Sequence, residues 1–91
     1  MPMTPKEAPG MNKLIEELGE LIQVCGKYLA YGETPHPDRK GPLRDRLEEE
    51  IADVLAAISF VIVSLDLDDI KIEERIAKKV NTYIDWHLTN L

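Results

Sequence analysis

The sequence predicts an all-α fold built from three main helices, and three observations support this prediction. Apolar residues recur every three or four positions through residues 11–31, 43–65 and 69–88, which is the period of an amphipathic helix. Proline, glycine and aspartate separate these three stretches. No stretch shows the strict alternation of a β-strand.

Length and charge limit the kinds of partner. A chain of 91 residues forms one small domain and buries only a limited fraction of its surface alone, so we expect a homodimer or homotetramer. Its 17 acidic and 11 basic residues give a net charge of −6, which argues against binding duplex nucleic acid. A small anionic ligand remains open if metal ions bridge it to the protein.

Three features favour a cytoplasmic protein without a membrane partner. The lone Cys25 cannot form an intramolecular disulfide and suits a reducing compartment, and we expect it to be a buried structural thiol. The first ten residues contain no apolar run of the signal-peptide type. The most apolar stretch, residues 54–65, is shorter than the roughly 20 residues that span a bilayer.

The chain begins with a segment that differs from the rest. Residues 1–10 contain three prolines and one glycine, which predicts a flexible N-terminal arm before a single helical domain over residues 11–91. Thr4 and Glu7 have the spacing of a capping box, so one helical turn in the arm is an equally good alternative.

The first helix is predicted over residues 11–31, with Gly32 as its stop signal. Residues 32–42 follow as a proline- and glycine-rich loop, long enough to reverse the chain, whose His36, Arg39 and Lys40 could close over phosphates or form an ordinary solvated turn. The apolar stripe of the first helix consists of Leu14, Leu18, Leu21, Ile22, Cys25 and Leu29.

The second helix, about residues 43–65, is apolar on nearly all sides in its second half. Such a helix must be enclosed on most sides, and two other helices of a short chain cannot do this, so we expect residues 54–65 to form a subunit interface. A turn with N-cap candidates Asp68 and Asp69 then leads into the third helix, about residues 69–88.

Two helices carry carboxylates at matching positions. Glu17 and Glu20 on the first, and Glu50 and Asp53 on the second, are three residues apart and so share a helix face. A helical wheel places Glu17 roughly 95° and Glu50 roughly 70° from the centres of their apolar stripes. Antiparallel packing would bring all four acids together.

Four hard oxygen ligands suit Mg²⁺, with Mn²⁺ as an alternative. Zinc is disfavoured because the chain has one cysteine and two well-separated histidines. The competing interpretation is a solvated acidic face, which is common on helices; repetition of the pattern on two helices argues against it.

At these residues the sequence resembles the MazG-like family of all-α nucleoside triphosphate pyrophosphohydrolases, in particular its short phage and bacterial members. The family's Glu-x-x-Glu and Glu-x-x-Asp motifs appear as Glu17-Leu18-Gly19-Glu20 and Glu50-Ile51-Ala52-Asp53, and Glu16 completes a doubled Glu-Glu-x-x-Glu form. The resemblance implies four-helix bundles completed by oligomerisation. It also implies Mg²⁺-dependent cleavage of an NTP or dNTP between the α and β phosphates, giving a monophosphate and pyrophosphate.

The resemblance also suggests roles for individual residues. Glu17, Glu20, Glu50 and Asp53 would hold the metal, and an unligated member of the group Glu16, Glu17 and Glu20 would orient the attacking water. If only one of Glu16 and Glu17 binds metal directly, we expect Glu17.

Substrate contacts are predicted on the first and last helices. The family tends to carry a basic residue and an asparagine on the last helix, for which Lys79 and Asn81 are candidates. Lys27 shares a face with Glu20 and could bind phosphate or be a plain surface lysine; Trp86 could stack on a base or serve in packing. The alternative function is a non-catalytic helical module that sequesters a nucleotide or docks a protein.

Overall fold

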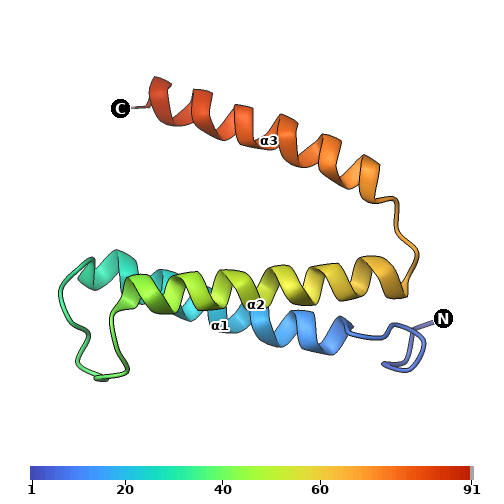
Figure 1. Cartoon of the computed structure of the whole chain (residues 1–91), viewed down its shortest axis with the longest axis horizontal. Helices are drawn as coiled ribbons and strands as arrows, with labels where there is room; N and C mark the ends of the chain where they lie inside the picture. The colour runs from blue at the N-terminus through green and yellow to red at the C-terminus, as the bar shows by residue number, and fades with distance from the viewer. Residues whose placement is uncertain (91) are drawn as a thin grey trace.

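The computed structural model describes residues 1–90 and is all-helical, as predicted. Three helices follow one another, α1 (Met11–Tyr31), α2 (Leu43–Ser64) and α3 (Asp69–Thr89), and no strand occurs in these residues (Figure 1). The predicted helix boundaries are confirmed to within one residue. No helix in the described part of the chain is long and apolar enough to cross a membrane.

Two helix ends follow directly from local sequence. α1 ends at Gly32, which has φ 55° and donates its N–H to the carbonyl oxygen of Tyr28 at 2.7 Å. Glycine adopts this positive φ without the steric cost that a Cβ would add. α3 begins after Asp68, whose carboxylate accepts the N–H of Lys71 at 3.0 Å, so one of the two predicted N-caps is confirmed.

The N-terminal segment contains the turn that Thr4 and Glu7 predicted. The Thr4 carbonyl accepts N–H groups from Glu7 and Ala8 at 3.0 and 3.1 Å, and Ala8 is buried. Gly10 has φ 81° and lies so close to the Phe60 ring that a Cβ there would clash. This segment thus closes over the start of α1 and the second half of α2.

α1 and α2 pack antiparallel along their length and enclose the core between them (Figure 1). The face of α1 that meets α2 differs from the predicted stripe: Val24 is buried, whereas Ile22, Cys25 and Leu29 are exposed. The expectation of a buried Cys25 is therefore wrong for the single chain. The buried apolar side chains are Ala8, Val24, Leu43, Val54, Ala57 and Val61.

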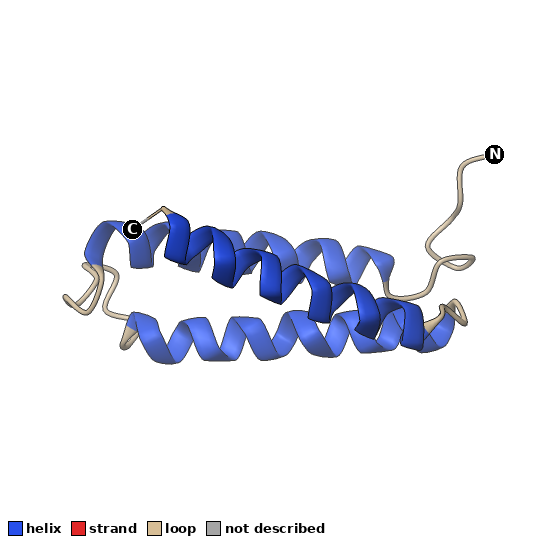
Figure 2. Ribbon diagram, turned by 90° about the horizontal axis from the view of Figure 1, so that it is seen from above, coloured by secondary structure: helices blue, strands red, loops and turns tan. Residues whose placement is uncertain are grey.

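α3 stands apart from this pair. It turns back after α2 and diverges from it (Figures 1 and 2). None of its residues is buried. Ile72 is half-buried and the other α3 residues are exposed, so its apolar face is uncovered. The large exposed apolar side chains of α3 are Ile70, Ile76, Val80, Tyr83, Ile84, Trp86 and Leu88.

Candidate metal centre

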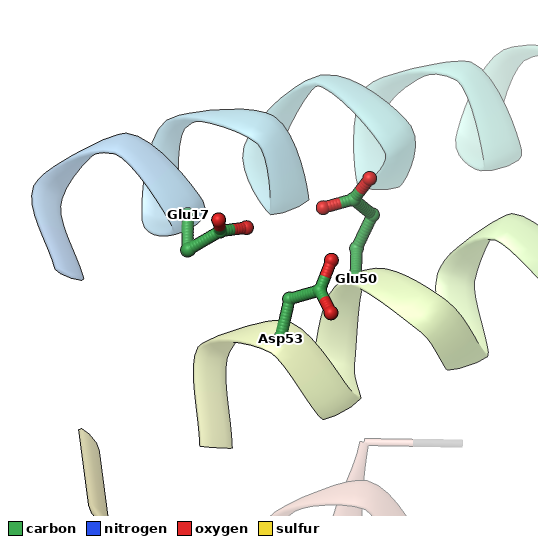
Figure 3. Close-up of side chains that lie close together, drawn as sticks. All are labelled: Glu17, Glu50 and Asp53. Carbon is green, nitrogen blue, oxygen red and sulfur yellow. The ribbon is translucent and has the colours of Figure 1, made fainter. Parts of the chain in front are cut away.

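Three carboxylates meet between α1 and α2. Glu17 of α1 points toward Glu50 and Asp53 of α2, and one carboxylate oxygen from each residue lies within 4.8 Å of the others (Figure 3). The antiparallel pairing creates this group from positions 33 and more residues apart in the sequence, since Glu17 faces the first half of α2. We call these three residues the acidic centre.

Two carboxylate oxygens of the acidic centre have no hydrogen-bond donor among the described residues. These are Oε2 of Glu17 and Oε2 of Glu50, both fully shielded from solvent. The other Glu17 oxygen lies 3.4 Å from Nζ of Lys13. A buried carboxylate oxygen without a partner is costly, and a divalent cation removes that cost, so hard oxygen donors in this arrangement fit Mg²⁺ or Mn²⁺.

Glu20 and Glu16 border the acidic centre without belonging to it. Glu20 is exposed, and its pKa is raised, chiefly by the negative charge of Glu17, then by desolvation and by the charges of Glu50 and Glu16. Glu16 is exposed and pairs with Lys13 at 3.3 Å. The hydrogen bond to Glu16 and the Glu16 charge raise the pKa of Lys13, and the hydrogen bond to Glu17 and the Glu17 charge add to this effect. Three of the four proposed metal ligands thus form the group, with Glu20 at its rim.

The position of Glu17 differs from the wheel prediction. Glu17 is only 8% exposed and lies on the contact line with α2, rather than at the edge of a buried stripe. The stripe centre on the helical wheel was the average direction of two apolar faces of α1. α2 packs on one of these faces, and the other is exposed in the single chain. Because only the first face is enclosed, the buried line of α1 is rotated toward Glu17.

The predicted substrate residues are placed differently from one another. Lys27 forms an ion pair with Asp38 of the α1–α2 loop, 3.0 Å between Nζ and Oδ2. Lys79, Asn81 and Trp86 are exposed on α3, and α3 contributes no residue to the acidic centre. Their proposed contacts with substrate stay predictions.

Two features near the acidic centre were missed in the sequence. At the loop end of the helix pair, Asp38 accepts hydrogen bonds from the side chains of Lys27 and Arg46. On the other side, a shallow pocket of about 370 Å³ is lined by Lys13, Glu17, Asp53 and the apolar Ala56, Ala57 and Phe60. Neither feature has a local sequence signal, because each depends on residues that only the packing of α1 on α2 brings together.

Comparison with known proteins identifies the family. The profile of the MazG nucleotide pyrophosphohydrolase domain matches residues 7–87, which is most of the chain and includes every residue of the acidic centre. The chain therefore belongs to the MazG family, as its motifs suggested, and the family indicates nucleotide pyrophosphohydrolase activity with a typical dependence on metal. No match was found among curated proteins or among solved structures.

Proposed function

We propose that this protein is a Mg²⁺-dependent nucleoside triphosphate pyrophosphohydrolase that cleaves an NTP or dNTP between the α and β phosphates, with Mn²⁺ as an alternative ion. The observation that carries the proposal is the pair of buried, unpartnered carboxylate oxygens on Glu17 and Glu50, beside Asp53. A solvated acidic face would leave those oxygens in water. Membership of the MazG family supports the reaction class.

The residues in and around the acidic centre have different proposed roles. Glu17, Glu50 and Asp53 would hold the metal, which when bound neutralises polyphosphate charge and lowers the pKa of a coordinated water. Glu20 would orient that water and take its proton, because it borders the acidic centre without belonging to it, whereas Glu16 is paired with Lys13 and Glu17 lies within the centre.

A second copy of the chain completes the proposed enzyme, as a homodimer or homotetramer. The support is the uncovered apolar face of α3 together with the exposed Leu55 and Val63 of α2. Monomeric proteins rarely leave apolar faces of this extent in water. In the assembly Lys79, Asn81 and Trp86 would contact the substrate from α3, of the same copy or of its partner.

The experiment is a panel of NTPs and dNTPs with Mg²⁺, scored for monophosphate and pyrophosphate. We expect Glu50→Gln and Asp53→Asn to reduce pyrophosphate release by at least about 100-fold, because each removes a charged metal ligand. The matched control is Glu49→Gln, an exposed acid on the same helix, which should retain activity within about twofold. Circular dichroism checks that the helices persist in every variant.

The outcomes separate the candidate functions. Undiminished release by both ligand variants would remove the metal-centre hypothesis. Saturable nucleotide binding with no product from the unmodified chain would instead support a sequestering module, the alternative that the sequence left open.

A further inference from the structure

Asp38 is the hub of an ion cluster at the loop end of the α1–α2 pair. Its Oδ2 accepts from Nζ of Lys27 at 3.0 Å, and Nη1 of Arg46 lies 3.1 and 3.2 Å from its two oxygens. Oδ1 also accepts the N–H of Lys40 at 3.1 Å, and Nδ1 of His36 lies 3.1 Å from Oδ2. One loop carboxylate thus fixes a cation from each of the two helices that carry the acidic centre.

Asp38 stays ionised at ordinary pH. Partial burial opposes ionisation of Asp38, but the Lys40 N–H and the side chains of Lys27 and Arg46 outweigh it and hold the Asp38 pKa well below its usual range. The side chains of Asp38 and Arg46 are 19% and 15% exposed, so solvent screens them less than it screens surface pairs.

The two cations exceed the charge of the carboxylate that holds them. Lysine has three N–H donors and arginine five, and the contacts with Asp38 involve Nζ of Lys27 and only Nη1 of Arg46. The cluster therefore keeps a net positive charge and spare donors in a chain whose net charge is −6. Lys27, whose side chain is 30% exposed, could therefore give its remaining N–H donors to a second anion while it keeps its contact with Asp38.

The cluster is close to the acidic centre along the helix axis. Arg46 precedes Glu50 by four residues on α2, about 6 Å at the rise of an α-helix. On the opposite side of the centre lies the shallow pocket formed in part by Ala57 and Phe60. The side of that pocket formed by Ala56, Ala57 and Phe60 suits a nucleoside, and its one cation, Lys13, is already paired with Glu16 and Glu17. The Lys27 and Arg46 cations suit phosphates, so the two ends of the site favour opposite ends of a nucleotide.

We propose that Asp38 is a positioning residue that holds Lys27 and Arg46 ready to bind the pyrophosphate portion of the substrate. The nucleoside end then lies toward Phe60, and the scissile bond lies over the acidic centre. Preorganisation is the physical advantage: a long cationic side chain that is already fixed loses less conformational freedom when it binds an anion. This inference rests on the proposed function, because it assigns an orientation to that substrate.

The test measures binding of inorganic pyrophosphate in the presence of Mg²⁺ by calorimetry. Asp38→Asn keeps the shape of the side chain and one acceptor oxygen but removes its charge. We expect the pyrophosphate dissociation constant to rise about 5- to 10-fold, the scale set by reordering one or two long side chains. Binding of a nucleoside monophosphate should change less than twofold, since the nucleoside end does not touch the cluster; a general loss of structure would weaken both ligands.

Asp45→Asn is the matched control. Asp45 is an exposed aspartate beside Arg46 in the sequence, so its substitution removes the same charge without breaking the cluster. Simple electrostatics predicts that losing a negative charge strengthens anion binding, in both variants. Weaker binding in Asp38→Asn together with equal or stronger binding in Asp45→Asn therefore identifies lost positioning.

A double variant shows whether Asp38 acts through Lys27. On a Lys27→Met background, Asp38→Asn should weaken pyrophosphate binding less than it does alone, because only the positioning of Arg46 is then left to lose. Pyrophosphate binding that is unchanged or tighter in Asp38→Asn overturns the inference, even if the chain hydrolyses nucleotides. Absence of pyrophosphate binding by the unmodified chain also overturns the inference. Pyrophosphate binding that is weakened in Asp38→Asn but not in Asp45→Asn supports it, even if the chain hydrolyses no nucleotide.

Discussion

The helices α1, α2 and α3 are similar in length, yet α1 and α2 pack on each other whereas α3 is left largely in solvent. The pair buries apolar residues from both helices and places three carboxylates between them. α3 buries no residue, although its apolar side chains recur with the same helical period. An amphipathic pattern therefore shows that a helix needs a packing partner for its apolar face. It does not show whether that partner belongs to the same chain.

The α1–α2 contact and the α3 face also carry two different free-energy costs. Between α1 and α2 the cost is electrostatic, because the buried carboxylate of Glu17 lies close to those of half-buried Glu50 and exposed Asp53, where an apolar seam would be more stable. On α3 the cost is hydrophobic, because an apolar face contacts water. A metal ion relieves the first cost and a second copy of the chain relieves the second, so each can be tested separately.

The largest effect is expected from a charge placed on the apolar face of α3. Ile84 is 52% exposed in the single chain, and Ile84→Asp would bury an unpaired carboxylate if a second copy covers this face. Hot-spot losses of about 2–4 kcal/mol correspond to a rise of at least about 30-fold in the dissociation constant of the oligomer. Light scattering coupled to size-exclusion chromatography measures the change.

Lys78→Asp provides the control, because Lys78 is exposed on the polar face of the same helix. We expect this variant to keep the assembly of the unmodified chain. Equal assembly of both variants would contradict the assignment of the α3 face to a subunit interface. A monomeric unmodified chain would do the same.

A smaller effect is expected from pH and metal at the acidic centre. The Glu17 charge raises the pKa of Glu20, so the folded chain binds this proton more tightly than the unfolded chain does. The Glu20 contribution to the free energy of unfolding is therefore most favourable at acidic pH and is lost as the pH rises through the raised pKa. Mg²⁺ should reverse the loss by compensating the carboxylate charges.

Thermal melts of the metal-free chain and of Glu20→Gln, from about pH 4 to about pH 8, isolate this contribution. The variant should melt higher than the unmodified chain at neutral pH, and the difference should shrink in acid and in Mg²⁺. A difference that does not depend on pH would show that Glu20 is not under the influence of the acidic centre. Asp38 contributes the opposite slope in strong acid, but it is common to both proteins and cancels.

The sequence predicted the helices well because their signals are local. Periodicity, Gly32 and Asp68 gave the elements and several of their ends, and the paired motifs identified three residues of the acidic centre. The burial of Glu17 and the exposure of Cys25 depend on which of two apolar faces α2 covers. The packing of α1 on α2 decides which face is covered, and it also brings Lys27 to the loop residue Asp38. The spacing of residues within one helix encodes neither of these tertiary contacts.

The smallest effect concerns the open side of α1. Gly19 and Gly26 lie inside the helix seven residues apart, and a Cβ at either position would meet no atom within 4 Å beyond the adjacent backbone of α1 itself. Gly19→Ala and Gly26→Ala should each raise the free energy of unfolding by about 1 kcal/mol, because alanine loses less backbone entropy in a helix. In a domain of this size that corresponds to about 4–8 °C in melting temperature. Stabilisation by Gly26→Ala alone, with Gly19→Ala destabilising, would mean that a second copy approaches α1 closely beside the acidic centre. The open face of α1 would then belong to the subunit interface, as we propose for the apolar face of α3.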